Sequence, residues 1–313
     1  WTPRPDIFAY ARYNRGYAPL SFTAGVVSAS PEVAPEFINA YEVGYKQNFG
    51  HTFSIDVAAF YYDYDAIQLP ITVSVNGLLQ TQFINYPKAE STGVELEGVW
   101  NPTRDLLFTL SYSYDYTALL TGCSGKISGG VLTPNVSNNS TCIINTEDPA
   151  GNGPGARVVG GTGPGGQIFS ATNPGLFQSV KGSPLPNSPQ NKLAVTGSYT
   201  FHFDPGNLLL AVTYVYRSSQ IGNVLFNTSY NTAPSWDDVD LRFTWSGDHD
   251  RYELIAFAKN LFNSLQYPTG ATAEGLNGNA TRGTAPGAAL IYNTTFELDP
   301  PRTFGVEARY KFF

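Results

Sequence analysis

The sequence lacks methionine, is poor in cysteine, histidine and charged residues, and has no long hydrophobic run. Its 313 residues include no Met, two Cys and three His, and only 14% of them are charged. The longest wholly apolar runs fall far short of the roughly 20 residues that a membrane-spanning helix needs, so insertion as a helix is excluded. The net charge of −7, without a cluster of Lys and Arg, argues against nucleic acid as a partner.

The small number of histidines and cysteines limits the possible catalytic and metal sites, and the absence of methionine bears on how the chain is processed. The three histidines, His51, His202 and His249, have no Cys or carboxylate partner at the usual metal-ligand spacing. The glycine-rich stretch 151–166 follows no strand and precedes no helix, so it does not fit a phosphate-binding loop. We therefore expect no enzyme, metal site or cofactor. Because Met is absent and the start does not look like a signal peptide, we expect a processed chain or a fragment.

Alternation of apolar and polar residues is the main pattern that the sequence does contain. In residues 104–117, Leu, Phe and Tyr at the even positions from 106 alternate with mostly Asp, Ser and Thr at the odd ones. Residues 302–313 alternate in the same way, up to a terminal phenylalanine. Side chains switch faces at every strand residue, so each stretch has one apolar and one polar face. A membrane barrel explains this pattern, because one face meets lipid and the other meets water.

The period of two predicts about ten strands, each long enough to cross a bilayer when tilted. They cover residues 6–17, 37–49, 51–66, 81–99, 104–117, 190–203, 206–219, 233–246, 250–262 and 302–313. The connections alternate in length. Tight turns at Gly50, 101–103, 204–205 and 246–249 alternate with long segments at 18–36, 67–80, 118–189, 220–232 and 263–301.

This alternation of connection lengths is typical of outer-membrane barrels, which have short periplasmic turns and long extracellular loops. A two-layer β-sandwich would show the same residue alternation, but its strands are usually shorter and its loops are not sorted by length. The sequence therefore predicts an all-β protein with an antiparallel transmembrane β-barrel, lying in an outer membrane.

Aromatic residues gather at the ends of the predicted strands. Those beside the short turns or the C-terminus are Phe49, Phe53, Trp100, Phe203, Trp245 and Phe312. Those at the opposite ends are Tyr61, Tyr114, Tyr116, Tyr214 and Tyr216. Amphipathic rings settle at lipid headgroups, so we predict a periplasmic and an outer membrane girdle.

The two cysteines, Cys123 and Cys142, lie in one long segment rich in Gly, Ser, Asn and Pro. We expect them to form a disulfide, which would constrain this segment by about 3 kcal/mol in the loop-closure treatment. Such a bond implies an oxidising compartment. The alternative is two unrelated thiols.

Several motifs follow one another along the chain. They include Tyr41-Glu-Val-Gly-Tyr-Lys46, Thr92-Gly-Val-Glu-Leu-Glu97, Ala258-Lys-Asn-Leu-Phe262 and the closing residues 302–312. In this order they resemble the barrel of TonB-dependent outer-membrane receptors. The resemblance implies a 22-stranded barrel, an N-terminal plug and a TonB box. Residues 1–313 would then be the C-terminal portion of the barrel, with the plug and the N-terminal strands elsewhere in the precursor or in a second chain.

The resemblance also implies a function and partners. We expect active import of a scarce nutrient across the Gram-negative outer membrane, with a ferric siderophore as the substrate because siderophore transport is common in the family. The expected partners are outer-membrane lipid, the missing strands and plug, the TonB complex through the plug, and the extracellular nutrient. The alternatives are a passive porin-like channel or structural surface barrel, and a secreted β-sandwich adhesin.

Two groups of residues are candidates for function. Ligand capture calls for aromatic and hydrogen-bonding groups at the outer strand ends. The candidates there are Arg15, Tyr17, Tyr64, Gln82, Phe83, Arg217 and Tyr267. Charges on the polar faces could pair with one another, or contact a plug or a substrate. These are Arg12, Glu42, Lys46, Glu95, Glu97, Arg242, Glu307 and Arg309.

Overall fold

The computed structural model consists of strands and their connections. It describes residues 1–22, 32–75, 78–120, 125–128, 131–134, 142–145, 156–158, 175–179, 181–222, 232–247, 251–270, 272–275 and 292–312. Within these ranges, no helix has the length and apolar character needed to cross a membrane.

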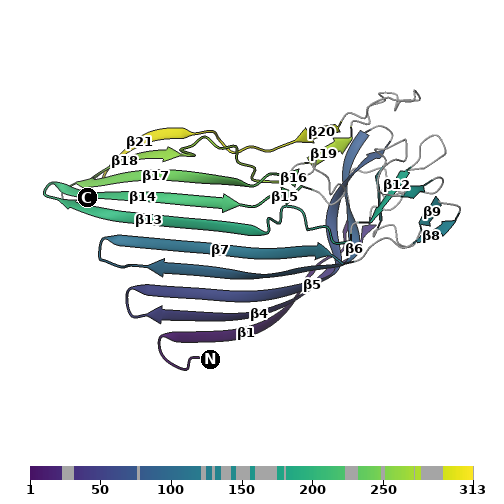
Figure 1. Ribbon diagram of the computed structural model, residues 1–313, viewed down its shortest axis with the longest axis horizontal. Helices are drawn as coiled ribbons and strands as arrows, with labels where there is room; N and C mark the ends of the chain where they lie inside the picture. Colours follow the sequence, from purple (N-terminus) through teal and green to yellow (C-terminus); the bar gives the residue numbers. More distant parts are fainter. Residues whose placement is uncertain are drawn as a thin grey trace.

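One ten-stranded antiparallel sheet runs through the chain (Figure 1). In spatial order, its strands are β1 (Ile7–Ala18), β4 (Glu36–Phe49), β5 (Phe53–Val75), β6 (Leu78–Trp100), β7 (Leu106–Leu119), β13 (Asn191–Phe203), β14 (Gly206–Arg217), β17 (Trp236–Gly247), β18 (Tyr252–Lys259) and β21 (Thr303–Tyr310). Spatial order equals sequence order, so every connection joins neighbouring strands. The predicted all-β antiparallel fold and its ten strands are confirmed.

The connections separate by length at the two ends of the sheet. Figure 1 shows the tight turns together at the left and the long connections together at the right. The long connections carry small sheets of their own. These pair β2 (Ser21–Phe22) with β3 (Glu32–Val33), β8 (Gly125–Ser128) with β9 (Val131–Pro134), β15 (Gln220–Ile221) with β16 (Thr232–Ala233), and β19 (Thr272–Gly275) with β20 (Tyr292–Thr295).

The longest connection also holds a three-stranded sheet. It consists of β10 (Cys142–Asn145), β12 (Gly175–Ser179) and β11 (Ala156–Val158). Cys142 pairs with Ser179 in this sheet. Cys123 lies outside the described residues, so the disulfide stays a prediction.

The prediction of a loop at residues 67–80 is wrong. β5 and β6 continue through this stretch as a paired ribbon, with Ile67 opposite Tyr86 and Val75 opposite Leu78. The alternation from Ile67 to Val75 supports this strand. Pro70 does not prevent it, because the ribbon extends past its neighbours and a proline is tolerated at an open strand edge. In Figure 1 the ribbon rises away from the sheet.

The ribbon departs from the sheet where Ala66 adopts a positive φ of 55°. The side chain of Asn85 holds this bend, because its Nδ2 donates to the carbonyl oxygens of Ala66 (2.7 Å) and Ala34 (2.9 Å). Around the bend, Tyr86 is fully buried, and its hydroxyl has no hydrogen-bond partner among the described residues. Burial raises the pKa of the Tyr86 hydroxyl, so this group stays protonated.

The register aligns apolar positions on neighbouring strands from β4 to β14. One row pairs, strand by strand, Tyr45, Val57, Leu96, Tyr112, Leu193 and Tyr216. We call the side that carries this row the apolar face. The opposite side, the polar face, carries the charged rows. A slip of one residue between any two strands would mix the faces, so the alternation in the sequence fixes the register.

Three glycines of the recurrent motifs share one structural role on the polar face. Gly44 faces Tyr10, Gly93 faces Phe60, and Gly305 faces Phe257 on the neighbouring strand. A Cβ at these glycines would lie 2.2, 2.7 and 2.2 Å from ring atoms of those aromatics. Each glycine therefore leaves room for an aromatic ring of the neighbouring strand to pack against the sheet. This packing helps to fix the register of the two strands.

Candidate functional site: the polar face of the sheet

Several charges on the polar face form ion pairs between neighbouring strands. Arg12 of β1 pairs with Glu42 of β4, which also accepts a hydrogen bond from Tyr10. Lys46 pairs with Asp56 in the same way. At the other edge, Arg309 pairs with Glu253 at 3.2 Å and with Glu307 at 2.6 Å. For these residues, the local pairing expected from the sequence is present.

A second set of polar-face charges forms no ion pair among the described residues. It comprises Glu95, Glu97, Lys192 and Arg242. Glu95, Ser113, Lys192, Arg217 and Trp236 lie directly opposite one another on five successive strands. We call these five residues the lumenal row.

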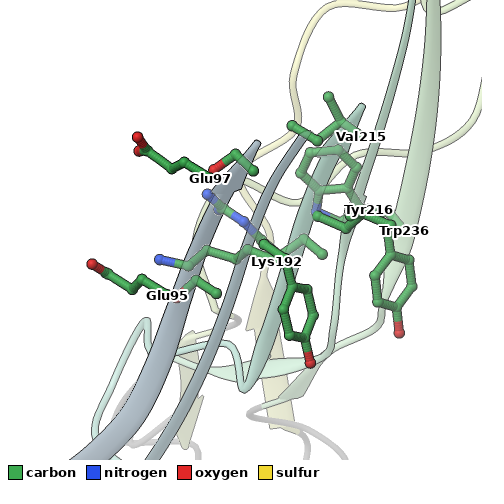
Figure 2. A pocket seen from close by; sticks show the side chains of 12 residues that line it. Glu95, Glu97, Lys192, Val215, Tyr216 and Trp236 are labelled. Carbon is green, nitrogen blue, oxygen red and sulfur yellow. The ribbon is translucent and has the colours of Figure 1, made fainter. Parts of the chain in front are cut away.

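The lumenal row lines a recess of about 350 Å³, together with Glu97. Figure 2 shows Glu95, Glu97 and Lys192 extending in the same direction, away from the strands. The recess offers carboxylates, an ammonium, a guanidinium, hydroxyls and an indole. Such a mixture is suited to binding a polar molecule through directed donors and acceptors. Among the described residues, no group of His, Cys, Asp and Glu could hold a metal ion.

Two side chains of the lumenal row, Arg217 and Trp236, and the side chain of Gln220 hold the segment that follows β18. Arg217 donates to the carbonyl oxygen of Pro268 at 2.7 Å, and its guanidinium lies 5.7 Å from the ring centroid of Trp236. Trp236 donates through Nε1 to the carbonyl oxygen of Tyr267 at 3.0 Å. Buried Gln220 donates to the carbonyl oxygen of Pro268 at 3.1 Å. The segment 263–270 is therefore fastened to the wall.

We predict that replacing Arg217 by Ala loosens this segment. A hydrogen bond from a charged group is worth about 1.5–3 kcal/mol, so cleavage of 263–270 should accelerate at least tenfold. Limited proteolysis by chymotrypsin, followed at the exposed Leu265, measures this rate. Lys192→Ala is the matched control, because it removes a cation from the same row without touching the segment. Equal cleavage rates in the two variants would contradict the assignment.

The structure places the predicted ligand residues in different regions. Arg217 and Tyr267 lie close to each other because Arg217 and Trp236 bind the backbone of the segment that contains Tyr267. The Tyr267 ring packs edge-on against Phe296, with 5.4 Å between centroids. Arg15 and Tyr17 lie on the strand positions of the apolar face, beside Phe37. These residues stay predictions as ligand contacts.

The remaining candidates belong to β5 and β6. Tyr64 lies on the polar face of β5, half-buried, and Phe83 is exposed on the ribbon. Gln82 lies in the ribbon opposite Ile71.

The sequence analysis missed Trp236 and Gln220. A signal for Trp236 existed, since it shares the even positions of Asp238, Asp240 and Arg242 on its strand. Gln220 lies beyond its strand, where alternation carries no information.

The predicted girdle residues form two rows on the apolar face. Near the short turns, ring centroids are 5.4 Å apart for Phe49 and Phe53, and 5.9 Å apart for Phe203 and Trp245. Trp100 joins this row beside Phe108, and Phe312 packs edge-on against Tyr310. Toward the long connections lie Tyr61, Tyr114, Tyr116, Tyr214 and Tyr216. That these rows meet lipid headgroups stays a prediction.

The distance between the rows matches a membrane. Phe53 and Tyr61 are eight residues apart on β5, which corresponds to about 26 Å along the strand. At a tilt near 40° this becomes about 20 Å along the membrane normal, close to the apolar band of about 25 Å in outer-membrane barrels. An antiparallel sheet with one apolar face between aromatic rows and one charged face is a section of the wall of a transmembrane β-barrel.

Comparison with known families agrees with this class. The family described as TonB dependent receptor-like, beta-barrel, matches residues 1–261. The chain therefore belongs to the TonB-dependent receptor β-barrel family. Members of this family are outer-membrane receptors and transporters of Gram-negative bacteria and not enzymes. A search of curated proteins found no match.

Solved structures show the same fold at low sequence identity. The ferric yersiniabactin uptake receptor FyuA from Yersinia pestis has a TM-score of 0.64 at 14% identity, covering 100% of this chain and 36% of that one. The siderophore receptor PiuA from Acinetobacter baumannii has a TM-score of 0.59 at 15% identity, covering 98% and 34%. The copper transporter OprC has a TM-score of 0.57 at 13% identity, covering 98% and 37%. The chain thus spans about a third of the length of these proteins.

Proposed function

We propose that this chain is the C-terminal part of the barrel of an outer-membrane receptor that imports a scarce nutrient. In this proposal, the extracellular segments bind the nutrient, and a plug inside the barrel is rearranged through TonB to open a path. The nutrient we propose is a ferric siderophore. The chain would supply the wall and part of the binding surface, and the plug and further strands would complete the receptor.

The observation that carries the proposal is the open sheet with two free edges. β1 and β21 each have one neighbour in the ten-stranded sheet. In hydrocarbon, each unsatisfied backbone group costs several kcal/mol, so a barrel wall has to close. Further strands between β21 and β1 would satisfy these groups. This chain covers about a third of FyuA and PiuA. That share is expected if it supplies ten strands of the barrel, while the plug and the other strands lie elsewhere.

The recess lined by the lumenal row and Glu97 supports a role in guiding a polar substrate or holding a plug. Glu95, Glu97 and Lys192 have no ion-pair partners within the described part of the chain, although Arg12, Lys46 and Arg309 on the same face do. Charges facing a water-filled interior without local partners remain available to a second molecule. The descriptions of FyuA as a ferric yersiniabactin uptake receptor and of PiuA as a siderophore receptor favour a siderophore, whereas OprC is a copper transporter.

The test is uptake of radioactive iron by cells that carry the full-length receptor and no other siderophore receptor. We expect saturable uptake of at least one ferric siderophore, reduced at least tenfold when TonB is deleted. Lys192→Glu, which reverses one charge of the lumenal row, should lower uptake while leaving the receptor in the membrane.

Two outcomes would contradict the proposal. Entry of small solutes that does not saturate and does not need TonB would indicate a passive porin-like channel. Saturable uptake of copper or of a sugar, with no competition by any ferric siderophore, would be compatible with active import. It would show that the proposed substrate, a ferric siderophore, is wrong.

A further inference from the structure

The apolar face is interrupted by a groove at Gly98. This glycine lies between Leu96 and Trp100 along β6, and between Ile55 and Leu110 on the neighbouring strands. Because its neighbours carry large side chains and Gly98 carries none, a groove of about 540 Å³ opens there. Its lining is apolar apart from Thr109.

The position of the groove restricts what can occupy it. Phe53, Trp100 and Phe108 line the groove and belong to the aromatic row near the short turns. The groove therefore opens toward the inner half of the membrane, where the surrounding medium consists of phospholipid chains. An acyl chain fits an apolar groove of this size, and Trp100 stands where the chain would meet its headgroup.

A cation with no partner among the described residues lies in the tight turn between Trp100 and Phe108, two residues that line the groove. Arg104 belongs to the tight turn that joins β6 to β7, four residues after Trp100, and is exposed. Its side chain forms no ion pair or hydrogen bond with the described residues. The adjacent carboxylate, Asp105, does not neutralise it, because Asp105 accepts a 2.7 Å hydrogen bond from His202 Nε2. Arg104 is thus available to an anionic phosphate.

We propose that the groove and Arg104 together bind one anionic phospholipid of the inner leaflet. One acyl chain lies over Gly98, and the phosphate lies at Arg104. This site is independent of the imported nutrient and of the proposed transport function.

The test uses the full-length receptor purified in detergent and mixed with one equivalent of phosphatidylglycerol, with retained lipid counted by native mass spectrometry. Gly98→Leu should reduce retention at least tenfold, because its side chain fills the groove. It should fold, because a Cβ at Gly98 meets its nearest atoms at 3.8 and 3.9 Å, which is ordinary contact. Gly98→Ala provides a milder second variant and should give an intermediate loss.

Arg104→Gln should reduce retention of phosphatidylglycerol about fivefold, the effect of one cation near an anionic surface. It should leave retention of an uncharged diacylglycerol unchanged. Ala256→Leu is the matched control, because it adds bulk to the apolar face on β18, away from the groove. Retention by Gly98→Leu or Gly98→Ala equal to that of Ala256→Leu would overturn the site. Equal retention of both lipids by the unaltered receptor would overturn the role of Arg104.

Discussion

Leu96→Arg is expected to destabilise the barrel by about 2–4 kcal/mol, the cost measured for Arg at the midplane of other outer-membrane barrels. Leu96 lies on the apolar face of β6, four residues from Trp100 in the inner aromatic row and four from Thr92 opposite Tyr61. It therefore lies near the middle of the membrane. The measurement is a denaturant titration of the full-length receptor folded into lipid vesicles.

Glu97→Arg is the control for this prediction. It places the same side chain one residue further along β6, on the polar face, where Glu97 is already exposed. We expect a change within about 0.5 kcal/mol, as for most exposed substitutions. Equal losses of stability in the two variants would mean that the two faces do not meet different media.

Gly93→Ala is expected to destabilise the barrel by about 1–3 kcal/mol, the usual cost of overpacking. A Cβ at Gly93 would lie 2.1 Å from the carbonyl oxygen of Tyr114 and 2.7 Å from the ring of Phe60. The oxygen belongs to the backbone of β7, so the strands themselves would have to move apart. The change can be measured as a lower midpoint in the same denaturant titration.

Gly98→Ala on the same strand makes the matched comparison. Its Cβ would meet only ordinary contacts, so the loss should be within about 0.5 kcal/mol. If both alanine variants were equally stable, Gly93 would not serve the close approach of Phe60, and the role assigned to the motif glycines would be wrong.

The ten strands could be predicted because their alternation has one physical cause throughout. In residues 106–117, for example, every even position meets one medium and every odd position the other, so the pattern is nearly free of exceptions. The short turns were equally visible, since the apolar pattern stops at Asn101-Pro-Thr103 and at Asp204-Pro205. The register followed, because a slip would turn apolar side chains toward the charged face.

The structure of the long connections at the other end of the sheet could not be predicted as completely as that of the ten strands. The ribbon formed by Ile67–Val75 and its partner alternates like the sheet, but residues 67–80 were predicted as one of the long connections. Pro70 is tolerated in this ribbon because the strand edge is open there. Arg217 stays a predicted ligand contact, but its hydrogen bond to the carbonyl oxygen of Pro268, 51 residues away in the sequence, was not predicted. Such contacts depend on how separate connections meet above the sheet, and no local pattern encodes them.

Spin labels placed along β6 of the full-length receptor, in lipid vesicles, can measure which medium each face of the sheet meets. We expect the apolar face to meet lipid and the polar face to meet an aqueous interior. Labels at Val94 and Leu96 should collide mainly with dissolved oxygen, and labels at Glu95 and Glu97 mainly with a water-soluble nickel complex. An alternation of period two along these four positions is the predicted result. Uniform accessibility at all four positions, or the opposite phase, would mean that the apolar face does not meet lipid while the polar face meets water.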